Sequence, residues 1–126
     1  MVREKIQPAL RKGFVVICDR YEDSTLAYQG FGRGLDQKFI LKISGFIRGN
    51  VVPDLTFILD IDPAEGMKRG GRRDRIERES FKFHQRVRKG FLTLARKNSR
   101  RYKVLNAVLS KNELSERIKK IVKQYL

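Results

Sequence analysis

A carboxylate and an arginine follow an apolar run near the start of the chain. Residues 14–18 read Phe-Val-Val-Ile-Cys and predict a short buried strand, and Asp19 and Arg20 come directly after it. Open α/β sheets bind their ligands at the carboxyl ends of their strands. A guanidinium at such a place can hold a phosphate through two parallel hydrogen bonds. An isolated Asp–Arg pair can equally be an ion pair that closes a strand.

Polar side chains continue beyond this pair at helical spacing, which favours the ligand-binding interpretation. They could place several polar groups on one face of a helical turn, and they are Ser24, Thr25, Tyr28 and Gln29.

A second candidate motif combines glycines with clustered arginines. Gly70 and Gly71 precede Arg72, Arg73 and Arg75. Glycines beside arginines predict a flap that closes over polyphosphate, where arginine can raise the rate of phosphoryl transfer by ~10³-fold or more. Taken alone, such a segment is more simply a solvated basic loop.

Both motifs resemble those of a known family. The run from Asp19 to Gly30 resembles the signature of the thymidylate kinases, which are P-loop nucleoside-monophosphate kinases. The string Asp74-Arg75-Ile76-Glu77 resembles the lid of bacterial members. The residues after it resemble the helix that follows that lid, namely Phe81, Phe83, Arg86-Val87-Arg88 and Gly90-Phe91. The resemblance extends over nearly the whole chain, from Ile6-Gln7-Pro8-Ala9-Leu10 to the last helix.

The resemblance implies an enzyme that phosphorylates dTMP to dTDP with ATP and Mg²⁺ in nucleotide biosynthesis. Arg20 would contact the dTMP phosphate, and Asp19 would lie near Mg²⁺ or orient Arg20. The nucleoside would be held by Ser24, Thr25, Tyr28 and Gln29, since a planar pyrimidine suits an aromatic face and an amide. The lid arginines Arg72, Arg73 and Arg75 would contact ATP, and together with Arg20 they would be the catalytic residues. The dipeptide Asn106-Ala107, which follows a strand, would also contact ATP.

The elements expected to position these residues alternate between strands and helices. That order predicts a parallel sheet, and the resemblance implies the three-layer α/β fold of P-loop nucleoside-monophosphate kinases, with residues 1–126 as one domain and a lid at about 69–78. Strands are expected at 14–18, 55–61 and 104–108, and helices at 2–12, 24–28, 79–97 and 113–125. Two more helices are expected after the capping residues Asp36 and Asp62, and the glycines at 30, 32 and 34 predict a flexible turn.

The phosphate-binding sequence G-x-x-x-x-G-K-[ST] is absent from the 126 residues. The resemblance therefore covers a C-terminal portion of the family's pattern, without its first strands and phosphate loop. We expect the isolated chain to be inactive. We also expect it to be marginally folded, to pair strands 14–18 and 55–61 directly, or to gain a strand from a partner. A non-catalytic remnant and one half of a split kinase remain alternatives.

Composition sets the remaining expectations. The chain carries 29 Lys and Arg against 14 Asp and Glu, a net charge of +15, which implies an anionic partner. A basic nucleic-acid-binding module is less favoured, because the phenylalanines fall on core-facing stripes rather than among the basic residues. The sequence predicts no membrane association, a cytoplasmic location, a homodimer or a separately encoded N-terminal half as partner, and a buried structural thiol at Cys18. The single histidine, His84, is expected to be a surface or packed residue.

Overall fold

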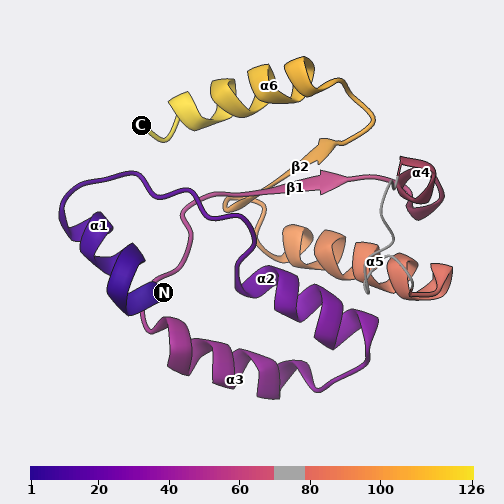
Figure 1. Ribbon diagram of the computed structural model, residues 1–126, viewed down its shortest axis with the longest axis horizontal. Helices are drawn as coiled ribbons and strands as arrows, with labels where there is room; N and C mark the ends of the chain where they lie inside the picture. Colours follow the sequence, from indigo (N-terminus) through magenta and orange to yellow (C-terminus); the bar gives the residue numbers. More distant parts are fainter. Residues whose placement is uncertain (70–78) are drawn as a thin grey trace.

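Helices dominate the residues that the structure describes, which are 1–69 and 79–126 of a computed structural model (Figure 1). In chain order the elements are η1 (Val2–Ile6), α1 (Gln7–Arg11), α2 (Glu22–Thr25), η2 (Leu26–Gly32), α3 (Gln37–Arg48), β1 (Thr56–Asp60), α4 (Pro63–Arg69), α5 (Phe81–Lys97), β2 (Tyr102–Asn106) and α6 (Lys111–Lys123). The π-type helix η1 continues directly into α1, and the π-type helix η2 follows directly after α2. No helix in the described ranges is long and apolar enough to cross a membrane.

Within the described residues the sheet has two strands, and they are parallel, as the alternation of elements predicts. β1 and β2 pair in register from Thr56 with Tyr102 to Asp60 with Asn106. The connection between them contains α5, and Figure 1 shows α5 on one side of the strands and α6 on the other. Helices thus lie on both sides of a parallel pair, in agreement with the expected α/β fold.

The buried core contains two apolar clusters, and one partly buried residue packs against both of them. Phe83 and Val87 of α5 pack against Ala27 of η2, and Ile58 packs with Tyr102 and Ala95 at the sheet. Phe91 contacts both clusters. Helix α5 is therefore the element through which η2 and the sheet are held together.

The contact between α5 and η2 requires glycine on each side. A Cβ atom at Gly32 would lie 2.7 Å from the Phe83 ring and 2.9 Å from Val87. A Cβ atom at Gly90 would lie 2.7 Å from Cγ and 2.8 Å from Cβ of Phe31. Gly32 therefore lies inside a continuous helix, and the predicted helix at 24–28 in fact extends from Glu22 to Gly32. The flexible turn predicted at glycines 30, 32 and 34 is wrong for Gly30 and Gly32, because both lie in η2, where Gly32 packs on α5 and Gly30 faces Gln37 and Ile40 of α3.

The helices predicted from capping residues are confirmed. The carboxylate of Asp36 accepts a hydrogen bond from Lys38 N at 2.9 Å at the start of α3, and that of Asp62 accepts one from Ala64 N at 2.8 Å at the start of α4. Ser110 and Glu113 form a reciprocal capping box on α6. The final strand begins two residues earlier than predicted, at Tyr102, because its pairing with β1 extends to Thr56. The predicted break at Gly70-Gly71 lies outside the described residues.

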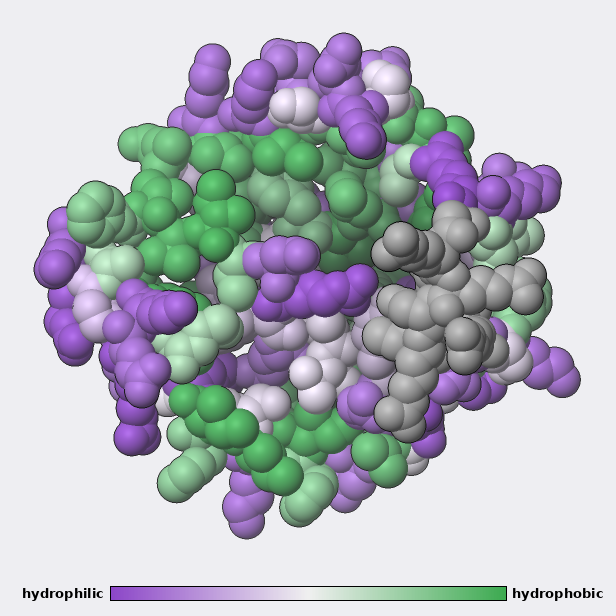
Figure 2. All heavy atoms as spheres, in the orientation of Figure 1, coloured by the Kyte–Doolittle hydropathy of each residue, from purple (hydrophilic) through white to green (hydrophobic). Residues whose placement is uncertain are grey.

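Helix α3 carries an apolar stripe whose helical spacing predicts core packing, and this prediction is wrong; the stripe is Phe39, Ile40, Ile43, Phe46 and Ile47. Only Ile40 of the stripe is buried, whereas Phe46 is 82% exposed and Phe39, Ile43 and Ile47 are also exposed. Figure 2 shows apolar side chains gathered along the lower edge of the molecule, over α3. The apolar residues of α3 do lie on one face of the helix. The rest of the described structure covers only one edge of that face.

The strand predicted at 14–18 does not form. Ile17 is 94% exposed, Phe14 and Val15 are exposed, and the segment pairs with neither strand of the sheet. Direct pairing of 14–18 with β1, one of the expected outcomes, is therefore absent from the described structure. Cys18 is exposed rather than buried, so its predicted structural role is wrong as well. An apolar run needs a neighbouring strand to satisfy its backbone, and the described residues supply none beside it.

The α5–η2 contact gives a direct test by substitution. Gly90→Ala places a methyl group against Phe31 and should lower the free energy of unfolding by about 1–2 kcal/mol, because overpacking outweighs the gain in helix propensity. Gly45→Ala, in α3 where a Cβ meets nothing within 4 Å, should raise it by about 0.5–1 kcal/mol. Urea unfolding measures both, and a Gly90→Ala chain as stable as Gly45→Ala would contradict the contact.

Candidate functional site

Arg20 has an unusual backbone conformation. Its φ of 65° lies in the left-handed region, and it is the one non-glycine residue of the described chain with a positive φ. Its guanidinium carbon lies 5.4 Å from the centre of the Tyr28 ring, a cation–π contact. Such a conformation costs on the order of 1–3 kcal/mol and is concentrated at functional sites. The exposed side chain of Arg20 lies against Tyr28 of the helix that follows it.

The three residues after Arg20 anchor that helix. The Tyr21 hydroxyl donates to the carbonyl of Val51 at 3.1 Å, and burial raises the pKa of Tyr21. Glu22 forms an ion pair with Arg48 of α3. These contacts hold the first turn of α2 against α3 and the loop that leads to β1.

Among the three residues that follow Arg20, Asp23 carries a buried carboxylate. It accepts a hydrogen bond from Arg101 Nη2 at 2.5 Å and another from the hydroxyl of Tyr102. Burial, and next the hydrogen bond to Asp23, raise the pKa of Tyr102 well above its ordinary value. Sequence reasoning gave Glu22 and Asp23 no role. Their partners lie elsewhere in the chain, Arg101 78 residues beyond Asp23, and no local pattern points to them.

The helix beyond Asp23 carries the predicted nucleoside-binding residues. Thr25 is exposed, and Ser24, Tyr28 and Gln29 are half-buried. The Tyr28 ring packs against Phe83 and Phe91 with ring centres 6.2 and 6.1 Å apart. The helix formed by α2 and η2 thus carries all four residues, and Tyr28 among them contacts Arg20.

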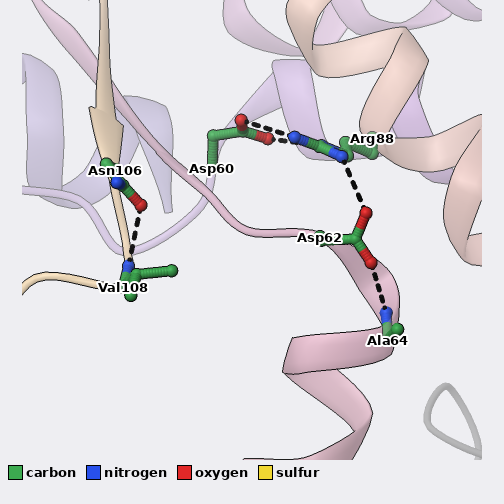
Figure 3. A network of polar contacts seen from close by, with 6 residues as sticks. All are labelled: Asp60, Asp62, Ala64, Arg88, Asn106 and Val108. Carbon is green, nitrogen blue, oxygen red and sulfur yellow. Dashed lines mark hydrogen bonds and ion pairs between the residues drawn. The ribbon is translucent and has the colours of Figure 1, made fainter.

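The carboxyl ends of both strands form a second polar group. The backbone N–H of Ala107 donates to the carbonyl of Asp60 at 2.8 Å, so Asn106-Ala107 lies beside the end of β1. The Asn106 side chain accepts from Val108 N at 3.0 Å (Figure 3). Arg69, at the end of α4, donates to the carbonyl of Ala107 at 2.8 Å.

Arg88 of α5 connects two carboxylates at this edge. It donates to Asp60 through Nε at 2.8 Å and Nη2 at 3.0 Å, and to Asp62 through Nη1 at 3.3 Å (Figure 3). The hydrogen bond to Asp60 raises the pKa of Arg88. Because Asp62 also caps α4, this arginine fixes β1, α4 and α5 to one another, a role that sequence reasoning missed.

A cleft of about 530 Å³ lies between Tyr28 and the strand end. That volume is typical of a small-molecule site. Its polar lining comes from Asp60, Arg88, Glu79 and His84 and its apolar lining includes Val87 and Phe91. His84 packs edge-on against Phe83, and within the described ranges its shielded Nε2 atom has no hydrogen-bond partner. The cleft joins the helix that carries the first motif to the strand end.

Comparison with known proteins identifies the family. The model of the thymidylate kinase family matches residues 1–118. The chain belongs to the thymidylate kinase family. It is 47% identical over 121 residues to the thymidylate kinase of Deinococcus radiodurans and 48% identical over 121 residues to that of Cutibacterium acnes, covering 94% and 96% of this chain. It spans 59% of the length of each of these relatives.

A solved structure supports the same fold. The crystal structure of thymidylate kinase from Ehrlichia chaffeensis superposes with a TM-score of 0.73 at 34% identity, covering 96% of this chain and 56% of that one. The P-loop nucleoside-monophosphate kinase fold expected from the sequence is thus confirmed. It is present here as a portion of the length that the kinases have.

The thymidylate kinase motifs are placed unevenly in the structure. Asp19 is exposed, and no group of three metal-ligating side chains occurs among the described residues. Asn106 and Ala107 lie at the strand end with Arg69. The lid arginines predicted to contact ATP, Arg72, Arg73 and Arg75, lie outside the described residues.

The Tyr102–Asp23 bond predicts a dependence of stability on alkaline pH. Because the folded pKa of Tyr102 is raised above its ordinary value of 10.0, its contribution is present below pH 10 and is lost as the pH rises further. Wild type should therefore lose more stability between pH 8 and pH 11 than Tyr102→Phe does, as measured by urea unfolding. Identical losses in wild type and Tyr102→Phe would contradict the bond.

Proposed function

We propose that this chain provides the dTMP-binding part of a thymidylate kinase that converts dTMP to dTDP with ATP and Mg²⁺. The observation that carries the proposal is the conformation of Arg20. Arg20 has a positive φ, and its guanidinium lies over Tyr28, in the helix that also holds Ser24, Thr25 and Gln29. The strain at Arg20 is the kind that a folded protein retains where a ligand is bound.

In this proposal Arg20 binds the phosphate, and the helix formed by α2 and η2 binds the nucleoside. A guanidinium matches two phosphate oxygens at once, and Thr25, Tyr28 and Gln29 offer a hydroxyl, an aromatic face and an amide to thymine and its sugar. Phosphoryl transfer requires positioning and charge neutralisation more than a strong base. A general base such as His84 is therefore unnecessary.

The ATP side of the proposal rests on the strand end and the lid arginines. Asn106 and Ala107 would contact adenine, and Arg72, Arg73 and Arg75 would neutralise charge on the transferring phosphoryl group. Mg²⁺ is commonly held by one or two carboxylates together with substrate phosphates. The single exposed carboxylate of Asp19 would therefore be enough on the protein side. When bound, the ion would neutralise phosphate charge.

The phosphate loop would come from a further segment that adds a strand to the sheet. Ile17, Phe14 and Val15 are exposed, and in β1 Leu59 is 54% exposed. A strand added beside β1 would cover side chains of this kind and complete backbone pairing. Without such a segment we expect the 126 residues to bind dTMP but to transfer no phosphoryl group, whether they act as half of a split kinase or as a non-catalytic remnant.

Replacement of Arg20 tests the proposal. Arg20→Ala should weaken dTMP binding by about 10- to 100-fold, because a charge-assisted bidentate contact contributes on the order of 1.5–3 kcal/mol. Isothermal titration calorimetry of the 126-residue chain with dTMP measures the change. Arg11→Ala removes the same charge from an exposed surface of α1 and should leave the affinity unchanged.

Two calorimetric outcomes would contradict the proposal. Equal affinity of Arg20→Ala and wild type would remove Arg20 from the phosphate site. Equal affinity of the wild-type chain for dTMP, dCMP and dGMP would show a general anion site, as the net charge of +15 alone would give.

A further inference from the structure

A buried carboxylate ties the proposed dTMP helix to the sheet. Asp23 is 6% exposed, yet it is one residue before Ser24 in the first turn of α2. Both of its oxygens are used, one by Arg101 Nη2 at 2.5 Å and the other by the hydroxyl of Tyr102, which is 7% exposed. Arg101 also lies over the Tyr102 ring, with its guanidinium carbon 4.7 Å from the ring centre.

This network can set the rotation of the helix about its own axis. Successive residues of an α-helix point about 100° apart, so a turn by one position would move Asp23 out of its partners' reach. A buried carboxylate without hydrogen-bond partners has a large free-energy cost. That cost exceeds what new contacts of the rotated helix could offset. Only one rotation of α2 therefore keeps Asp23 paired, and that rotation fixes the directions of Thr25, Tyr28 and Gln29.

Neighbouring contacts restrict the same turn. Tyr21 is bonded to Val51 and Glu22 to Arg48, so three consecutive side chains hold the helix start from three sides. Among them Asp23 alone reaches β2, and the other end of β2 carries Asn106. The network thus joins the proposed nucleoside helix to the strand that leads to the proposed adenine contact.

We propose that Asp23, acting through Arg101 and Tyr102, is a positioning residue for nucleoside recognition. It does not touch dTMP; it holds α2 at the rotation in which Thr25, Tyr28 and Gln29 face the thymine and sugar. Arg20 precedes the helix and would reach the phosphate with its own guanidinium, so we expect weak phosphate binding to persist when the network is lost. The inference rests on the proposed function and deepens it by separating selectivity for the base from affinity for the phosphate.

The test compares selectivity with stability in the 126-residue chain. Affinities for dTMP and dCMP are measured by calorimetry for wild type, Asp23→Asn and the milder Tyr102→Phe, below the unfolding transition of each. Ser110→Ala serves as the matched control, because loss of the α6 cap destabilises the chain far from α2. We expect the preference for dTMP over dCMP to fall about tenfold in Asp23→Asn and less in Tyr102→Phe, and to be unchanged in Ser110→Ala.

The possible outcomes separate the two proposals. Loss of preference in the Asp23 and Tyr102 variants, with retained weak binding of both nucleotides through Arg20, supports the positioning role. A preference equal to wild type in both variants overturns it and leaves the proposed function intact. A parallel loss in Ser110→Ala also overturns it, since destabilisation alone would then explain the effect. A wild-type chain that binds no dTMP overturns the proposed function and this inference together.

Discussion

Helix α5 and the helix formed by α2 and η2 lie in contact at two points where one of them has no side chain. Phe83 and Val87 occupy the space over Gly32, and Phe31 occupies the space over Gly90. Arg86 of α5 adds a hydrogen bond from Nε to the carbonyl of Gly32 at 2.9 Å. Close packing of this kind transmits position, because interiors at crystal-like density do not slide. The location of Tyr28 relative to the cleft therefore depends on these contacts.

Helix α5 also connects to the strand end. Arg88 is bonded to Asp60 and Asp62 there, and Phe91 touches both apolar clusters. One helix thus places the end of β1 and the nucleoside helix against each other. The side chains of the first motif fall into two sets. Asp23 is buried in the interior, whereas Arg20 and Thr25 are exposed. Stability arises from the inward set, and the proposed recognition of dTMP uses the outward set.

Local patterns in the sequence predicted what depends on local physics. The helices that begin after Asp36 and Asp62 follow from capping residues and apolar spacing, and the structure confirms both. The run at 14–18 has equally clear apolar character but forms no strand, because a strand depends on a neighbour that no local pattern supplies. The exposed stripe of α3 differs from prediction for the same reason. Spacing shows which face is apolar, whereas burial depends on what lies against it.

The candidate site shows the same division. Arg20, Thr25 and Tyr28 could be predicted as neighbours because they are close in sequence. The bonds from Asp23 to Arg101 and from Arg88 to Asp60 join residues 78 and 28 positions apart. Charged residues are frequent in this chain, so no spacing distinguishes these partners from the others. Long-range pairing of this kind emerges only from the packed structure.

The central claim is that the first motif of this chain is a dTMP site, and chemical-shift mapping tests it most directly. Titration of the ¹⁵N-labelled chain with dTMP should perturb the amide signals of Arg20, Ser24, Thr25 and Gln29 at a common affinity. Signals of the basic helix α6, whose last turn contains Lys120 and Lys123, should remain in place. Perturbations confined to α6, or spread evenly over basic segments, would show that dTMP is attracted by net charge alone and would contradict the claim.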